Sequence, residues 1–186
     1  MKFYKFFRYN TAKNYSECFI KDDSVWKNEN LYCNEMLEMH DASIEYILSK
    51  NIPPVDFPNA DAFLLSKRFY NIINNLNKNF YSIESFLFFK NGIKDYDFYT
   101  IVFPKYKLLN LDKADYETDT VYGSNEKFIW RINKIVLNKE SIHTVKEDNF
   151  FCLEEEPLTL ICTETAKQAI EEAGLTGIDF EEIPVE

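Results

Sequence analysis

The side chains best suited to chemistry are four carboxylates that lie close together in the chain. Asp112, Asp115, Glu117 and Asp119 fall within one eight-residue stretch. Paired carboxylates can act as acid and base in hydrolysis, or they can hold a hard cation. A calcium loop, however, needs a glycine and a regular acidic spacing that this stretch lacks, and runs of like charge are usually solvated. The first interpretation is therefore a solvated surface, the second a partner-facing surface, and the third a catalytic group.

Neither the histidines nor the cysteines are spaced as metal ligands or as a catalytic pair. A zinc site needs three or four ligands at short, defined spacing. The candidates here are widely scattered: His40, His143, Cys18, Cys33, Cys152 and Cys162. Cys152 and Cys162 stand in apolar stretches and are predicted to be buried thiols without catalytic activation. Motifs such as GxGxxG and GxSxG are absent. We therefore expect no metal, no cofactor and no enzymatic activity.

The charge balance narrows the class of partner. The 186 residues include 31 Asp and Glu against 21 Lys and Arg, a formal net charge of −10. Nucleic acids and anionic membranes attract clustered cations, so the composition disfavours both as partners. Residues 1–9 are aromatic but interrupted by charges, unlike the apolar stretch of a signal peptide. No apolar run approaches the roughly 20 residues of a membrane span. We expect a cytoplasmic protein.

Two parts of the chain show the same order of strand, cap and helix. Residues 62–65 precede a helix predicted over Ser66–Leu76, and residues 159–162 precede a helix predicted over Thr163–Ala173. The first residue of each helix carries a hydroxyl that can cap it. The second helix has a narrower buried stripe, made of alanines. The match indicates either two copies of one supersecondary unit or two independent strand–helix junctions, and both interpretations stay open.

Most of the other apolar stretches are typical of strands. Besides the two strands above, strands are expected at 2–9, 81–89, 98–103, 106–111, 128–133 with a continuation at 135–137, 143–145, 150–153 and 178–181. One more helix is expected over 36–50, where Ile44, Ile47 and Leu48 share a face. These elements predict an α+β fold with a mixed, mainly antiparallel sheet and a few packed helices, in a single domain over 1–186.

The segment that holds the four carboxylates is expected to be irregular. Residues 112–125 are polar, acidic and contain Gly123, so they are predicted to form an acidic loop. In the strand that follows, Phe128, Trp130 and Ile132 alternate with polar residues and are predicted to share one buried face.

Several motifs together resemble those of a known family. Residues 63–69, Phe-Leu-Leu-Ser-Lys-Arg-Phe, resemble its strand–helix junction, and residues 106–110, Tyr-Lys-Leu-Leu-Asn, resemble a second element. An acidic loop follows, in which Thr118 or Thr120 stands where the pattern has serine. The most specific part is Ala-Ile-Glu-Glu-Ala-Gly-Leu-Thr-Gly-Ile-Asp-Phe at 169–180. The likeness covers roughly Phe57–Glu186 and is to the immunity proteins of bacterial polymorphic toxin systems, type eleven; residues 1–54 are divergent.

The resemblance implies a small, non-enzymatic cytoplasmic protein that binds a cognate toxin domain and neutralises it. Immunity proteins often meet a basic toxin surface through acidic groups and a few aromatic anchors. The residues expected to face the partner are the acidic loop and its tyrosines, namely Asp112, Asp115, Tyr116, Glu117, Asp119 and Tyr122. Tyr96 and Tyr99 also stand beside acidic residues. The alternatives are a hydrolase that uses Asp112, Asp115 and Asp119, and a scaffold or oligomer subunit without a toxin partner.

Overall fold

A computed structural model describes most of the chain. The described residues are 1–8, 17–21, 43–50, 52, 54–60, 62–89, 91–92, 94–145 and 147–186, with the backbone alone for 94–96. His40, Cys33 and residues 36–42 of the predicted helix therefore lie outside the described residues, and so does the side chain of Tyr96.

The first sheet has five strands around the N-terminal strand. Its order is β13 (Ile178–Ile183), β1 (Phe3–Arg8), β12 (Leu160–Thr163), β11 (Phe150–Leu153) and β8 (Lys105–Tyr106). All neighbours are antiparallel except β11 and β8. Strands β11 and β12 are buried along their whole length, because the sheet carries a hydrophobic cluster on each face.

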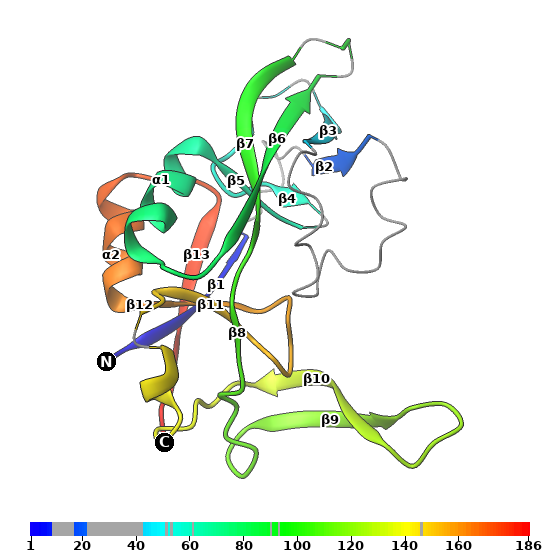
Figure 1. Ribbon diagram of the computed structural model, residues 1–186, viewed down its shortest axis with the longest axis vertical. Coiled ribbons are helices and arrows are strands. Elements are labelled where there is room, and N and C mark those ends of the chain that lie inside the picture. The colour runs from blue at the N-terminus through cyan, green and yellow to red at the C-terminus, as the bar shows by residue number, and fades with distance from the viewer. Residues whose placement is uncertain are drawn as a thin grey trace.

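The second sheet has six strands and lies above the first in Figure 1. Its order is β4 (Asn59–Ala60), β2 (Glu17–Ile20), β3 (Ile44–Leu48), β6 (Tyr81–Phe88), β7 (Lys94–Val102) and β5 (Phe63–Ser66). The neighbours are antiparallel except β2 with β4 and β3 with β6. Both sheets are thus mixed and mainly antiparallel, which confirms the predicted α+β class.

Two helices follow β5 and β12 and lie side by side (Figure 1). Helix α1 spans Lys67–Leu76 and α2 spans Glu164–Glu172. The predicted caps are confirmed, because the Ser66 hydroxyl accepts from the Phe69 amide and the Thr163 hydroxyl from the Ala166 amide. The order of strand, cap and helix is the same in both parts, and the two strands belong to different sheets.

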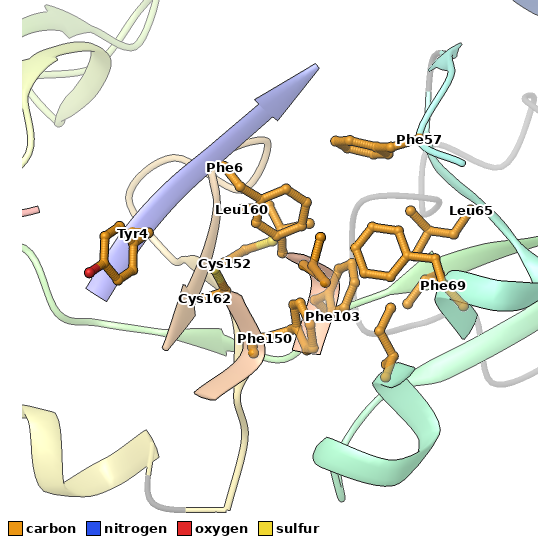
Figure 2. Packing of buried hydrophobic residues seen from close by; sticks show 14 residues of the cluster. Tyr4, Phe6, Phe57, Leu65, Phe69, Phe103, Phe150, Cys152, Leu160 and Cys162 are labelled. Carbon is orange, nitrogen blue, oxygen red and sulfur yellow. The ribbon is translucent and has the colours of Figure 1, made fainter. Parts of the chain in front are cut away.

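The central core joins the two sheets and both helices. Phe69 of α1 and Ala166 of α2 are fully buried in one cluster with side chains from β1, β5, β7, β11 and β12. Figure 2 shows Phe6, Phe69 and Phe150 gathered between the sheets, with ring centroids 5.8–6.0 Å apart. Ala166, in the narrow buried stripe of the second helix, is fully buried in the same cluster.

Two predicted elements are wrong in type. Residues 44–48, expected at the end of a helix, form strand β3. Ile44, Tyr46 and Leu48 point into the core there, and the Tyr46 hydroxyl is hydrogen-bonded to that of Thr100 at 2.9 Å. Every second residue of 44–48 is buried, and the segment pairs with β2 and β6. These strand contacts outweigh the helical spacing of Ile44, Ile47 and Leu48. The expected strand at 143–145 is instead a 3-10 helix over Ile142–Val145.

The expected acidic loop is also wrong, because much of it is a strand. Strand β9 spans Asp115–Thr120 and pairs with β10, Lys127–Lys134, in a separate two-stranded antiparallel sheet. The extension expected at 135–137 has no strand of its own, although Leu137 bridges Leu109 and Val185.

Candidate partner-binding surface

The β9–β10 hairpin, meaning the two strands and their connecting turn, extends away from the rest of the molecule (Figure 1). Only its inner face meets the core, where Ile132 is 9% exposed and Tyr116 and Ile129 are partly buried. At its base, the Asn110 amide donates to the Val136 carbonyl at 2.8 Å. In the turn just before β9, the backbone amides of Asp112, Lys113 and Ala114 donate hydrogen bonds to Asn110. The Tyr-Lys-Leu-Leu-Asn motif therefore anchors the hairpin to the five-stranded sheet.

Two irregularities in β10 decide which side chains face the solvent. Ile129 lies opposite Thr118, but Arg131 lies opposite Glu117, so Trp130 is an extra residue without a partner on β9. A second extra residue, Asn133, follows in the same way. Each β-bulge shifts the alternation of the strand by one position. Residues that would share a face in a regular strand are therefore divided between the two faces.

The bulges overturn the prediction that Phe128, Trp130 and Ile132 share one buried face. Ile132 lies opposite Tyr116 on the inner face and is buried. Phe128 lies opposite Asp119 on the outer face and is 46% exposed, and Trp130 is 54% exposed. The hairpin therefore presents two large aromatic side chains to the solvent, which the alternation in the sequence concealed.

The predicted partner-facing residues fall on different parts of this hairpin. Asp115, Glu117 and Asp119 line the outer face of β9, and Tyr122 is fully exposed in the turn. Asp112 is exposed in the turn before β9. Tyr116, in contrast, points toward the core cluster and is only partly exposed. The structure thus gathers the acidic side chains on one face and separates Tyr116 from them.

Two of the three acidic residues on the outer face of β9 have a basic residue opposite them in the strand register. Asp115 lies opposite Lys134 and Glu117 opposite Arg131, while Asp119 lies opposite Phe128 and has no cation across from it. Glu117 also accepts a hydrogen bond from the Asn133 amide group at 3.2 Å. The hairpin is therefore not the open acidic stripe that the sequence suggested. Near the tip, Asp119 lies beside the exposed aromatic side chain of Phe128.

Tyr99, which also stands beside acidic residues, is less available as an anchor. Tyr99 stacks on Tyr70, with ring centroids 4.1 Å apart and planes 14° apart, and it packs against the central core. A stacked, half-buried ring already has its partner within the fold, so Tyr99 has little surface left for another protein.

A buried carboxylate, Asp56, connects two of the motifs that carry the family likeness. Its side chain accepts from the Ser66 hydroxyl at 2.6 Å, the Thr176 amide at 2.9 Å and the Thr176 hydroxyl at 3.0 Å. Arg68 lies 3.8 Å from the same carboxylate and donates to the Ala173 carbonyl at 2.5 Å, at the C-terminal end of α2. A cation there also stabilises the helix dipole. The motif residues therefore hold the helices together.

Sequence reasoning missed Asp56, because its partner Thr176 is 120 positions away. The tight packing leaves room for no side chain at Gly177, where φ is +83° and a Cβ would lie 2.5 Å from Val55 Cγ2. In this Thr-Gly pair, Thr176 supplies two hydrogen-bond donors, its amide and its hydroxyl, and Gly177 allows the close approach of Val55. Both roles are structural.

A second polar network joins the other ends of the helices. The Asn77 side chain accepts from the amides of Asn149 and Phe150 and donates to the Phe150 carbonyl, all within 2.9 Å. Asn149 in turn accepts from the Thr163 hydroxyl at 2.6 Å, at the start of α2. Nearby, Asp148 accepts from the Tyr106 hydroxyl, and burial with this contact raises the pKa of Tyr106.

The described cysteines and His143 are placed as structural residues. Cys18, Cys152 and Cys162 are buried free thiols, and burial raises the pKa of Cys18 to about 12 and that of Cys152 and Cys162 as well. A thiol with a raised pKa is a poor nucleophile at neutral pH. The His143 ring is exposed, with Nδ1 2.6 Å from the Glu140 carbonyl oxygen. None of the helices in the described ranges is long and apolar enough to span a membrane.

Comparison with known proteins agrees with the motifs. The model of a family described as the Immunity protein family (Imm11) matches residues 35–185, which is most of the chain. The match begins earlier than the stretch from Phe57 on which the likeness was recognised. No curated protein matches the sequence significantly.

Proposed function

The chain belongs to the Immunity protein family (Imm11), and from this premise we propose that it binds a cognate bacterial toxin domain in the cytoplasm and neutralises it without catalysis. The observation that carries the proposal is the family match over residues 35–185. The net charge of −10 adds support, because it favours association with a basic protein surface.

The distribution of the motif residues favours binding over catalysis. Ser66, Arg68 and Thr176 are engaged with Asp56 in holding the helices. The carboxylates considered for a hydrolase are spread along a strand, where residues four apart, such as Asp115 and Asp119, are separated by about 13 Å. Two carboxylates at that separation cannot hold one cation between them. The hydrolase alternative therefore has weak geometric support.

The proposed contact surface is the outer face and turn of the hairpin. It comprises the predicted residues Asp112, Asp115, Glu117, Asp119 and Tyr122, with Tyr116 supporting them from the inner face. A projecting hairpin can change its outer side chains without disturbing the central core, which suits a surface that is matched to one specific partner.

Growth of cells that express the toxin domain encoded beside this gene tests the proposal. Cells that also express this chain should survive, and the two proteins should co-purify in a fixed ratio. If the surface of the toxin is basic, raising the salt from about 50 to about 500 mM should slow association, because the Debye length falls from about 14 to about 4 Å. Death of the co-expressing cells, with no complex, would reject the proposal.

A further inference from the structure

We propose that the distal half of the hairpin, meaning Asp119, Tyr122, Phe128 and Trp130, enters an apolar pocket of the toxin that carries a Lys or Arg at its rim. This inference rests on the proposed function. It states which part of the hairpin surface determines the affinity and which chemical groups the toxin uses to bind it. The base of the hairpin, with Asp115 and Glu117, then contributes little.

The first support is the concentration of exposed aromatic surface. Tyr122, Phe128 and Trp130 lie within nine residues and are 104%, 46% and 54% exposed. Aromatic residues such as these dominate the energetics of protein interfaces because each buries a large, rigid area. Scattered exposed apolar residues are ordinary, but a group on one projecting element marks a surface that another protein covers.

The second support is that the exposure of Trp130 follows from the backbone. As the extra residue of the first bulge, it has no cross-strand neighbour on β9 to pack against. The same bulge places Phe128 on the outer face and Ile132 in the core. Bulges commonly re-aim a side chain beside a functional site. The bulge therefore exposes Phe128 and Trp130, which in a regular strand would lie on the same buried face as Ile132.

The third support comes from the charges, which identify the partner. Lys134 and Arg131 lie opposite the two acidic side chains nearest the base, while Phe128 lies opposite Asp119. Lys127 lies opposite Thr120, on the inner face. A toxin that covers the distal half must therefore neutralise Asp119 itself, which calls for a cation beside the apolar pocket. The net charge of −10 is complementary to such a cationic rim.

The shape of the hairpin favours insertion. Among the described residues, the hairpin packs on the protein core through its inner face, and its two-stranded sheet includes no third strand. The distal half stands clear of both larger sheets (Figure 1). A narrow ribbon of this kind fits a concave site, such as the mouth of a catalytic cleft, better than a flat surface.

Calorimetric titration of the purified toxin domain encoded beside the gene tests the assignment. The double variant F128A/W130A should weaken binding at least thirtyfold, since a truncated hot-spot residue typically costs about 2 kcal/mol or more, and each 1.4 kcal/mol is tenfold. The control L158A removes an exposed apolar side chain of 64% exposure from another part of the surface and should leave Kd within about twofold. Unchanged melting temperatures show that all three proteins are folded.

A second pair of variants tests the charge argument. D119N should weaken binding about fivefold or more, whereas E117Q, at a position opposite Arg131 in the strand register, should change Kd by less than about twofold. Equal effects, or a larger effect of E117Q, would overturn the assignment of Asp119. Hydrogen exchange should slow at residues 119–130 in the complex, and slowing confined to other segments would overturn the docking site.

The outcomes separate this inference from the proposed function. If the wild-type chain binds the toxin and F128A/W130A binds equally well, the docking site is wrong and the function stands. If the wild-type chain neither binds nor protects, both are wrong. If the chain alone forms a dimer that F128A/W130A converts to monomers, a second copy covers the hairpin, and the toxin pocket is rejected.

Discussion

Replacing Asp56 by alanine tests whether the family motifs act as a structural connection. The Asp56 side chain is 8% exposed and accepts three hydrogen bonds, from the Ser66 hydroxyl and from the amide and hydroxyl of Thr176. The substitution removes the acceptor for all three, while the hydrogen bond from Arg68 to the Ala173 carbonyl stays in place.

The magnitude follows from the exposure of the donors. A hydrogen bond to a buried charged group contributes about 1.5–3 kcal/mol, but Thr176 is exposed and can bond to water instead. Each hydrogen bond should therefore contribute about 1 kcal/mol to the free energy of unfolding, so that D56A loses about 3 kcal/mol in total. The Arg68 contact adds little, because its side chain is 60% exposed. For a chain of this size, about 3 kcal/mol lowers the melting temperature by about 6–12 °C.

Thermal unfolding followed by circular dichroism measures the effect, with D112A as the matched control. Asp112 is exposed, so the same change there should alter the free energy of unfolding by less than about 0.5 kcal/mol. A melting temperature of D56A within 2 °C of that of D112A would refute the view that Asp56 connects the helices.

Three further changes have distinct expected results. G177A should lower the free energy of unfolding by about 2–4 kcal/mol, because Gly177 has a positive φ and lies close to Val55. The control G174A, at a glycine with φ +60° and open space around it, should lower the free energy of unfolding by about 1 kcal/mol. Equal losses for the two variants in denaturant titrations would contradict the packing argument. Burial raises the pKa of Glu155 above 4.5 despite nearby backbone amides. The contribution of Glu155 to stability therefore falls as the pH rises through that raised pKa. E155Q should be more stable than wild type at pH 7 but equally stable below pH 4, and chemical denaturation at each pH measures the difference. In a C33S background, a thiol reagent should label the native protein only as fast as it unfolds, and rapid labelling at neutral pH would argue against the burial of Cys18, Cys152 and Cys162.

Local chemistry made part of the fold predictable. Ser66 and Thr163 were recognised as caps because a hydroxyl before an apolar stripe satisfies the free amides of the first turn, and both caps are present. Strand β3 was missed because Ile44, Ile47 and Leu48 also fit a helical spacing. Pairing with β2 and β6 decides the outcome there, and those partners are not local in the sequence.

The sequence shows which segment is acidic, but it did not predict the structure of that segment. The acidic residues at 115–119 were identified from their spacing, yet their strand structure depends on pairing with β10. The exposure of Phe128 and Trp130 depends on a β-bulge. The residue types in this segment do not predict that bulge. Asp56 was missed for a similar reason, since its hydrogen bonds to Thr176 span 120 positions. Long-range pairing and backbone irregularity therefore set the limit of the sequence analysis.

Neutralisation by stoichiometric binding is tested most directly by titrating the purified toxin domain encoded beside the gene with this chain in a calorimeter. The prediction is a saturable isotherm with a fixed molar ratio, in which F128A/W130A binds at least thirtyfold more weakly than wild type. Absence of binding heat at several temperatures, together with full activity of the toxin in the presence of excess chain, would contradict it.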